Sequence, residues 1–352
     1  MDKKTKVLIV GNLGYVGSEV CKFLYSKNVE IYGIDPNWFG DQDLLDEMNI
    51  CVKKQWIKDI RDVLVDKEIW KVKYDAVIYL AAVSNDPMGK RFANVTHKIN
   101  AEYCHEVAKI AKSNGVKKIV FASSCSMYGA SDSNFPSEND DLSPMTEYAV
   151  SKVWAERKLE EISDESFYSI ALRFATACGP SSNLRLDLVL NDLVASALKN
   201  KKVEVLSDGT PWRPLIHVKD MARAIFWAIN YIPKNYFLPI NVGSKEFTFQ
   251  IKDFAKLVSE AIPETTLTIA TGKAVDSRSY KVNFGLYEEL AGEEYYPKFD
   301  AKKAIDDLIN FIKDLDIPDN FRESKKWMRL KALENKIDNN LMDEDLNFIK
   351  NI

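Results

Sequence analysis

Short apolar runs alternate with amphipathic stretches along the first half of the chain. Several runs are continuous and rich in Val and Ile, which is typical of strands that are buried on both faces. Their order predicts strands at residues 6–10, 30–34, 51–53, 76–80, 118–122 and 168–173, and helices at about 15–26, 95–113 and 148–162. This alternation indicates an α/β fold with a Rossmann-like, doubly wound parallel sheet.

The pattern becomes irregular after about Cys178, where Gly179-Pro180-Ser181-Ser182-Asn183 predicts a loop. Beyond it, periodicity predicts helices at about 186–199, 219–230 and 250–261, strands at 203–206 and 239–242, and two helical patterns after residue 317. We therefore expect a smaller, mixed α/β lobe beside the main sheet. A length of 352 residues is enough for about two domains.

Composition narrows the class of protein. The chain has 48 Lys and Arg against 52 Asp and Glu, a formal net charge of −4, which argues against a nucleic-acid binder. No apolar run reaches about 18 residues, so we expect no membrane span, and the first apolar run is too short for a signal peptide. The five cysteines are widely spaced and there are three histidines. We expect reduced thiols, no metal site and a cytoplasmic location.

A glycine motif stands between the first predicted strand and helix, at Gly11, Gly14 and Gly17. Glycines let the backbone approach a pyrophosphate, and the helix N-terminus offers free N–H groups to it. Asp35 ends the next strand, where a carboxylate would accept hydrogen bonds from the adenosine ribose and repel a 2′-phosphate. This favours NAD over NADP. An ordinary strand–turn–helix and a turn acid remain the alternatives.

A Tyr-x-x-x-Lys pair, Tyr148 and Lys152, lies on one face of a predicted helix. A nearby ammonium lowers the pKa of a tyrosine, so the pair could act as a general acid/base while a hydride leaves the substrate carbon. Ser124 follows a predicted strand at its carboxyl end, where such sheets bind ligands, and could hydrogen-bond a sugar hydroxyl. A solvated helix face and a polar strand-to-loop transition are the alternatives.

Together these motifs resemble the extended short-chain dehydrogenase/reductase superfamily, specifically its NAD-dependent nucleotide-sugar epimerase/dehydratase branch. The resemblance covers residues from about 5 to about 315. Its elements occur in the family's order: GNLGYVG at 11–17, Asp35, Lys58-Asp59-Ile60, Leu80-Ala81-Ala82, Asn100, SSCSMYG at 123–129, YAVSK at 148–152, Leu172-Arg173-Phe174 and RPLIHV at 213–218.

The resemblance implies a role for each matching residue. Tyr148 would be the base, Lys152 its partner and Ser124 the third catalytic residue. NAD would be bound by Gly11, Leu13, Gly14, Tyr15, Val16, Gly17, Asp35, Asp59, Ile60, Leu80, Ala81, Ala82, Asn100, Ser123, Tyr148 and Lys152. A nucleotide-diphosphate sugar would be bound by Ser84, Ser124, Cys125, Thr176, Arg185, Asn191, Arg213 and Arg278, the last two arginines at its diphosphate.

Three departures from the family pattern matter. The 4,6-dehydratases carry Thr-Asp-Glu where this chain has Ser124-Cys125-Ser126, so we do not expect dehydratase activity. The cysteine of the 3,5-epimerases would stand at Ser126, so Cys125 is better interpreted as a packed thiol. Thr176 replaces a frequent Asn, which weakens the inference about sugar contacts.

The segments 184–192, 211–214 and 278–280 resemble a subgroup associated with bacterial surface-polysaccharide clusters, which includes enzymes that oxidise C4 of a GDP-linked heptose. Arg185 and Asn191 would face the sugar or nucleotide, or equally cap and solvate a helix. We expect hydride transfer at C4, by a 4-epimerase or 4-dehydrogenase. A 4-keto-sugar reductase, a reductase of small ketones and a catalytically silent NAD-binding sensor are the alternatives.

The family pattern also predicts the domain organisation. Residues 1–179 and 215–245 would form the NAD-binding domain, 180–214 and 246–316 the nucleotide-sugar lobe, and 317–352 a helical C-terminal tail. A homodimer through the helices at 95–113 and 148–162 is expected from the same resemblance.

Overall fold

The computed structural model describes residues 4–129, 135–271 and 279–349. A seven-stranded sheet has the order β10-β6-β5-β4-β1-β2-β3, and every neighbouring pair is parallel. The strands are β1 (Lys6–Val10), β2 (Glu30–Asp35), β3 (Val52–Ile57), β4 (Ala76–Tyr79), β5 (Lys118–Ser124), β6 (Tyr168–Phe174) and β10 (Phe237–Val242). The Rossmann-like, doubly wound sheet predicted from the sequence is confirmed.

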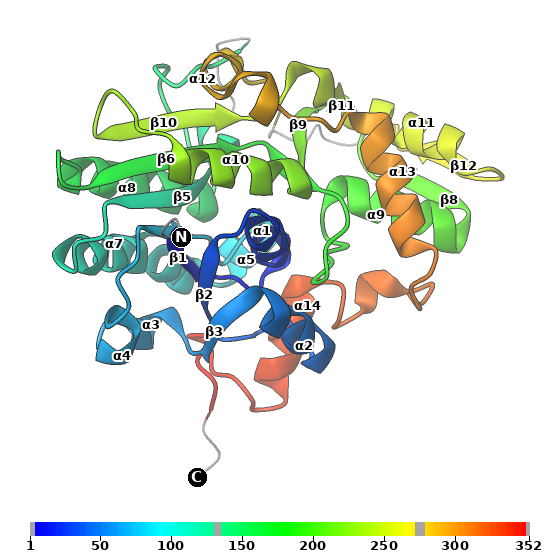
Figure 1. Ribbon diagram of the computed structural model, residues 1–352. Coiled ribbons are helices and arrows are strands. Elements are labelled where there is room, and N and C mark those ends of the chain that lie inside the picture. The colour runs from blue at the N-terminus through cyan, green and yellow to red at the C-terminus, as the bar shows by residue number, and fades with distance from the viewer. Residues whose placement is uncertain (1–3, 130–134, 272–278, 350–352) are drawn as a thin grey trace.

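Helices cover both faces of this sheet (Figure 1). One face packs on α1 (Tyr15–Ser26), α2 (Gln42–Cys51), α10 (Val218–Asn230) and α12 (Gly285–Tyr295). The other packs on α6 (Ala93–His97), α7 (Tyr103–Ser113) and α8 (Glu147–Ile162), with the short α3 (Ile60–Val63), α4 (Lys67–Trp70) and α5 (Asp86–Arg91) beside them. The strand order reverses at β1, between β2 and β4, and sheets of this kind bind ligands at the carboxyl ends beside such a reversal.

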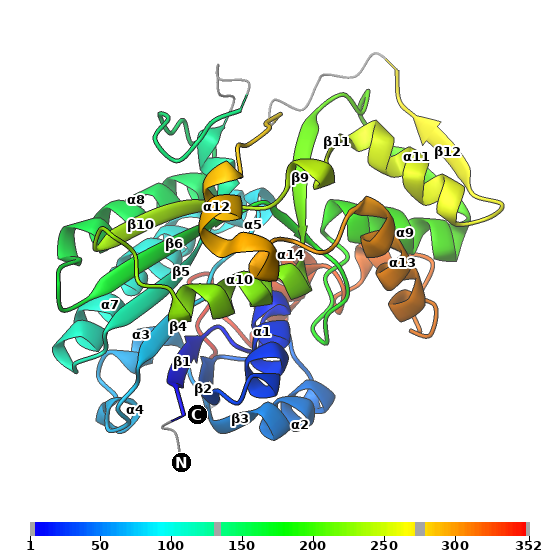
Figure 2. The same cartoon turned by 45° about the horizontal axis from the view of Figure 1, so that its top comes forward.

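A third core lies to one side of the main sheet, as Figure 2 shows. It is built from α9 (Val189–Asn200), α11 (Ile251–Ala261), α13 (Ala301–Ile312) and the two-stranded pair β8 (Lys202–Val205) and β12 (Thr266–Ile269). A small sheet of β7 (Thr176–Cys178), β9 (Trp212–His217) and β11 (Thr248–Gln250) lies between this lobe and the main sheet. Among the described residues, no helix is long and apolar enough to cross a membrane.

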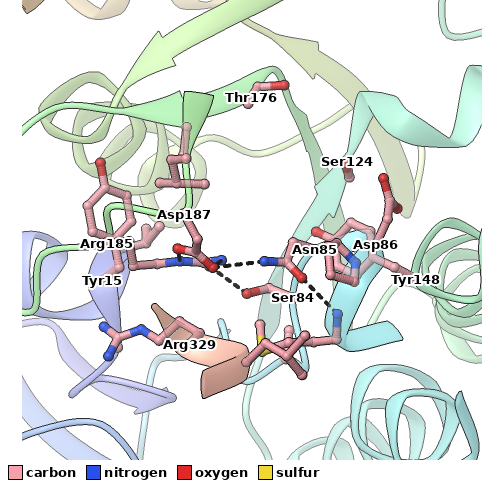
Figure 3. Close-up of a pocket in the computed structure, with 18 of the residues that line it drawn as sticks. Tyr15, Ser84, Asn85, Asp86, Ser124, Tyr148, Thr176, Arg185, Asp187 and Arg329 are labelled. Atoms are coloured by element: carbon pink, nitrogen blue, oxygen red, sulfur yellow. Dashed lines mark hydrogen bonds and ion pairs between the residues drawn. The ribbon is translucent and has the colours of Figure 1, made fainter. Parts of the chain in front are cut away.

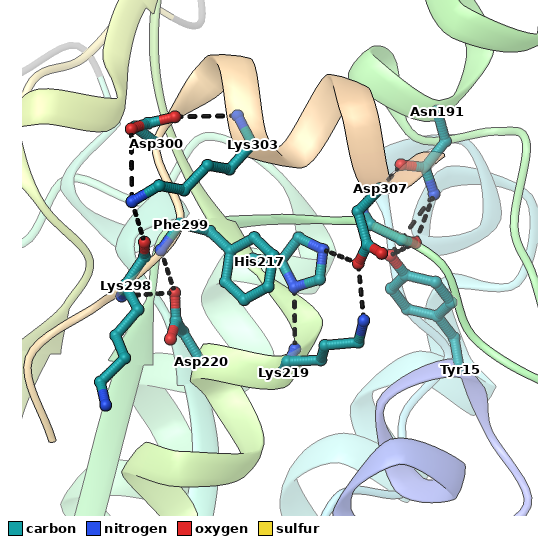
Figure 4. Close-up of polar contacts among 11 residues, drawn as sticks. Tyr15, Asn191, His217, Lys219, Asp220, Lys298, Phe299, Asp300, Lys303 and Asp307 are labelled. Atoms are coloured by element: carbon teal, nitrogen blue, oxygen red, sulfur yellow. Dashed lines mark hydrogen bonds and ion pairs between the residues drawn. The ribbon is translucent and has the colours of Figure 1, made fainter. Parts of the chain in front are cut away.

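A polar cluster around the buried His217 joins the two lobes at the end of β9 (Figure 4). His217 is fully buried and stacks on Phe299 with ring centroids 3.7 Å apart. Its Nδ1 accepts from the Lys219 amide at 3.2 Å, and its Nε2 lies 3.2 Å from Asp307 on α13. The close approach of His217, together with Lys219, lowers the pKa of Asp307 to about 2. These contacts hold α13 against the start of α10.

Two predicted elements differ from the structure in informative ways. The helix expected at 95–113 is interrupted by a π-helical turn at Lys98–Glu102. Within that turn the Ile99 carbonyl accepts from the Tyr79 hydroxyl at 2.6 Å, and Asn100 hydrogen-bonds the backbone of Val83. The wider turn therefore ties the helix to the loop after β4, which periodicity alone does not show.

The C-terminal segment, residues 317–349, is less helical than predicted. It contains one α-helix, α14 (Arg329–Asp338), and a short 3₁₀ turn at Phe321–Glu323 among its described residues. Phe321 and Trp327 pack into the smaller lobe, whereas Leu333 and Leu346 pack into the main one. The segment therefore spans both lobes.

Candidate active site

One cavity of about 1030 Å³ opens at the carboxyl ends of the main sheet and is lined by residues of both lobes and of the C-terminal segment. Figure 3 shows Ser124, Asp86 and Tyr148 at one end of this close-up, and Tyr15 and Arg329 at the other. Most of the predicted site residues lie in its lining: Gly11, Leu13, Gly14, Tyr15, Val16, Gly17, Asp35, Asp59, Ile60, Leu80, Ala81, Ala82, Ser84, Ser123, Ser124, Tyr148, Lys152, Thr176, Arg185 and Arg213.

The glycine turn between β1 and α1 is fixed by its own packing. Gly11 has φ +90°, and a Cβ there would lie 2.6 Å from the Ala81 nitrogen. A Cβ on Gly17 would lie 2.2 Å from the Gly11 carbonyl oxygen, whereas one on Gly14 would meet that oxygen at 3.4 Å. No side chain caps the N-terminus of α1, and its first turn holds no acid. This end of the helix suits the diphosphate of NAD.

Asp35 lies at the end of β2, beside the glycine turn. Its carboxylate accepts from the Leu13 amide at 3.1 Å and the Asn37 amide at 2.8 Å. Burial raises the pKa of Asp35 to about 6, although both hydrogen bonds oppose this shift. Nearby, Asp59 caps α3 and pairs with Arg61 at 2.7 Å. A carboxylate held in this way at the end of β2 can accept hydrogen bonds from ribose hydroxyls.

Tyr148, Lys152 and Ser124 line the same cavity. The Lys152 Nζ donates to the Ala122 carbonyl at 2.7 Å and lies 5.6 Å from the centre of the Tyr148 ring. Burial raises the pKa of Tyr148 to about 12, against a lowering contribution from a hydrogen bond with Ser124. Burial lowers the pKa of Lys152 to about 8. The expectation that the pKa of Tyr148 is lowered is wrong for this geometry, because burial outweighs the attraction of the Lys152 ammonium for a tyrosinate.

Four side chains, Ser84, Asn85, Arg185 and Asp187, form a polar wall of the cavity, with Asn85 beside Asp86 (Figure 3). Arg185 makes a two-pronged ion pair with Asp187, at 2.9 and 2.8 Å, and donates to the Ser84 hydroxyl at 2.7 Å. Asn85 donates to the same Asp187 carboxylate at 2.9 Å and caps α5, where it adopts φ +88°. Arg185 therefore belongs to a fixed network and does not simply cap a helix.

Three predicted contact residues lie outside the cavity lining. The Asn100 side chain bonds Val83, and Cys125 is fully buried and donates to the Arg173 carbonyl at 3.0 Å. Asn191 accepts from the Gly179 amide at 3.0 Å and donates to the Arg185 carbonyl at 2.9 Å. These side chains bind the backbone of segments around the site and do not line the cavity. Their placement therefore gives no support to a direct contact with a ligand. Arg278 lies outside the described residues.

Arg213 and Thr176 meet at a tyrosine that sequence reasoning did not identify. Tyr280 lies with its hydroxyl 3.3 Å from that of Thr176, and its ring centre is 5.3 Å from the Arg213 guanidinium. Asp187, Asn85, Asp86 and Arg329 are also lining residues that were missed. The Arg-x-Asp spacing and the Asn-Asp-Pro helix start were available signals for the first three. Nothing local to the sequence marks Arg329.

Comparisons with known proteins agree with this geometry. Residues 7–243 match the NAD dependent epimerase/dehydratase family. A putative UDP-glucose 4-epimerase from Methanocaldococcus jannaschii is 24% identical over 323 residues, which cover 87% of this chain and 98% of that protein.

Solved structures share the fold. A UDP-glucose 4-epimerase from Bifidobacterium longum in complex with NAD⁺ and UDP has a TM-score of 0.76 at 21% identity, covering 87% of this chain and 98% of that one. An NAD-dependent NDP-hexosamine 5,6-dehydratase involved in tunicamycin biosynthesis also has a TM-score of 0.76, at 20% identity, covering 89% of this chain and 99% of that one. The cofactor is NAD, and the chain belongs to the NAD dependent epimerase/dehydratase family.

Proposed function

We propose that this protein is a nucleotide-sugar 4-epimerase or 4-dehydrogenase that removes a hydride from C4 of its substrate. The observation that carries the proposal is the meeting of Tyr148, Lys152 and Ser124 in one cavity with the glycine turn of α1. UDP-glucose 4-epimerases recur among its relatives, including a second one from Lactobacillus helveticus at 26% identity.

We assign the cofactor to the side of the cavity that the glycine turn and Asp35 form. The first turn of α1 would hold the diphosphate and Asp35 the adenosine ribose. Asp59 and Ile60 would lie beside adenine, and Leu80, Ala81, Ala82 and Ser123 along the rest of the dinucleotide. Gly11 and Gly17 would act through the shape of the backbone, since their own Cβ positions are blocked by protein atoms.

Tyr148 is the proposed general acid/base. At neutral pH its phenol carries a proton, as a pKa of about 12 requires, so it is ready to return a proton to a 4-keto oxygen. In the oxidative direction it must lose that proton, and the Lys152 ammonium close to the ring favours the tyrosinate. Ser124 would steady the sugar hydroxyl, and NAD, when bound, accepts the hydride.

The substrate would lie along the polar wall. Ser84 and the Arg185–Asp187 pair can orient sugar hydroxyls, and Arg213, beside Tyr280, is placed for the anionic diphosphate. Arg278, proposed for the same role, lies outside the described residues. Cys125 faces the core, so we assign it no chemical role.

The fate of the keto sugar after hydride transfer decides which reaction the enzyme catalyses. Rotation of the keto sugar before the hydride returns gives epimerisation, and release of the keto sugar gives net oxidation. Dehydration needs an acid near the sugar, and positions 125 and 126 supply none, although Asp86 lines the cavity and a 5,6-dehydratase shares the fold. A GDP-linked heptose, in surface-polysaccharide synthesis, remains the substrate proposed from the sequence resemblance.

We also propose a homodimer and a cytoplasmic location for this protein. Trp154 on α8 packs edge-on against His97 and His105 of α6 and α7, which gives these helices a shared outer face for the homodimer predicted from resemblance. The five free cysteines fit a cytoplasmic location. We keep the division into an NAD-binding domain and a nucleotide-sugar lobe as predicted, with β10 in the main sheet.

Turnover of UDP-, GDP-, dTDP- and CDP-sugars, followed by NMR of the products, tests the proposal. We expect one of them to be converted and Tyr148→Phe to lose about 10²–10⁴-fold in kcat, with its NAD content unchanged. No conversion by the wild type, with NAD bound, would instead favour a catalytically silent NAD-binding sensor. A mass spectrum of small molecules released from the purified protein would identify the bound nucleotides.

A further inference from the structure

Arg329 is a buried cation whose guanidinium is only partly bonded. It is 3% exposed, yet it lines the cavity. Its Nη2 donates to the Asn183 carbonyl at 2.9 Å and also to the Asn183 side-chain oxygen. Its Nη1 has no hydrogen-bond partner among the described residues. A buried, charged nitrogen without a hydrogen-bond partner costs free energy in the folded protein, and the bare Nη1 therefore points to an anionic ligand.

The position of Arg329 identifies the part of the cavity that this ligand would occupy. Asn183, which holds Nη2, donates its own amide to the Leu13 carbonyl at 2.7 Å, so the guanidinium is fixed to the glycine turn. Its carbon lies 4.3 Å from the centre of the Phe39 ring, on the loop that follows Asp35. Figure 3 places Arg329 at the same end of the cavity as Tyr15, away from Tyr148.

Electrostatics support a ligand with negative charge. Burial, and then the nearby Arg185, lower the pKa of Arg329 to about 9. Arg185 is neutralised by its contact with Asp187, whereas Asp187 and Asp35 act on Arg329 through charge at a distance. The α1 N-terminus beside it adds a positive dipole end and no acid. The two negative phosphates of a diphosphate could pair with the Arg329 guanidinium and with the N-terminus of α1.

We propose that Arg329, supplied by the C-terminal segment, binds the diphosphate of NAD through Nη1 and closes the cofactor side of the cavity. This inference rests on the proposed placement of NAD along the glycine turn. It gives the C-terminal segment a function, because the segment packs on both lobes and carries Met328, Leu330 and Lys331 to the cavity beside Arg329. A substrate diphosphate shares the chemistry, so the experiment compares the two.

Binding measurements on Arg329→Met test the proposal, since Met keeps an unbranched stem against Phe39. We expect the affinities for NAD⁺ and ADP, measured by calorimetry, to fall about 10- to 100-fold, with adenosine, UDP and GDP affinities unchanged. Arg322→Met is the matched control, because this arginine of the same segment is already paired with Asp192 at 2.8 Å. It should bind ADP as the wild type does.

Several outcomes would overturn the assignment. If the ADP affinity is unchanged, Arg329 does not contact the cofactor. If adenosine loses as much affinity as ADP, the contact is not to the diphosphate. If only UDP or GDP loses affinity, Arg329 binds the substrate instead. An equal loss in Arg322→Met would show displacement of the whole segment. If Arg329→Met does not fold, Arg329→Lys, which keeps the charge but not the fork, should still lose ADP affinity more than about twofold. Failure of the wild type to bind NAD⁺ would instead refute the proposed cofactor placement.

Discussion

The two sides of the cavity are built in different ways. The proposed cofactor side depends on backbone: a glycine turn, a helix N-terminus, and a carboxylate fixed by the amides of Leu13 and Asn37. The proposed substrate side depends on side chains from distant segments, where Ser84, Asn85, Arg185 and Asp187 form one network. Ligand binding and stability should therefore depend on backbone shape at the first side and on single charged side chains at the second.

The glycine turn provides the sharpest test of the backbone side. Gly17→Ala puts a Cβ 2.2 Å from the Gly11 oxygen and 2.7 Å from the Asn12 backbone, neither of which can yield without moving β1 or α1. We expect NAD binding to be lost and the free energy of unfolding to fall by more than about 3 kcal/mol. Denaturant unfolding and NAD content measure both effects.

Gly14→Ala is the matched control for that substitution. Its Cβ would meet one atom at 3.4 Å and its φ of −70° suits alanine, so the unfolding free energy should stay within about 1 kcal/mol of the wild type. If Gly17→Ala were as stable as Gly14→Ala, the close approach of the backbone would not be what requires glycine.

The charge network is the corresponding test of the substrate side. Asp187→Asn removes the negative charge that neutralises Arg185, in a pair whose side chains are only 9% and 11% exposed. Breaking a buried pair by removing one partner costs about 3–5 kcal/mol. We expect that loss in the free energy of unfolding, together with a raised KM for the nucleotide sugar.

An exposed ion pair provides the comparison. Glu68 and Lys71 are 60% and 69% exposed, so Glu68→Gln should cost no more than about 0.5 kcal/mol. Equal losses for Asp187→Asn and Glu68→Gln would show that the polar wall behaves as ordinary surface.

The sequence could predict features that depend on local patterns better than features that depend on contacts between distant segments. The strands, Asp35 and the Tyr148–Lys152 pair depend on local patterns, and the structure places them together as expected. Asn100 was predicted to lie beside the cofactor and Asn191 to face the substrate or to cap a helix, but both amides bind backbone groups of loops that only the folded chain brings close. Cys125 is a packed thiol, the interpretation favoured from the sequence. Arg329 could not be predicted, because its site is completed by Asn183 and the glycine turn, far away in sequence.

Acid pH should separate the two sides without a mutation. Burial raises the pKa of Asp35 to about 6, so the carboxylate proposed to accept hydrogen bonds from the ribose is lost below that pH. We expect the Kd for NAD⁺, measured by calorimetry, to be nearly flat from pH 8 to 7 and to rise about fivefold from pH 6 to 5.

Asp35→Asn should flatten this profile, and constant affinity down to pH 5 would contradict the assignment of Asp35. Protonation of Asp35 would not weaken NAD⁺ binding by unfolding the protein. A carboxyl whose folded pKa lies above its unfolded value costs stability at neutral pH, and that cost decreases as the pH falls toward 4.

Cys125 should show the smallest effect, because it belongs to neither side. Its thiol is fully buried, donates to the Arg173 carbonyl, and has its pKa raised well above the usual value by burial, so it cannot exchange protons with a sugar. Cys125→Ser keeps a donor of similar size, and we expect kcat within about twofold of the wild type, since no reacting group changes. A loss of more than about tenfold, with NAD content and melting temperature intact, would mean that the thiol reaches the substrate and that the core behind Ser124 opens during turnover.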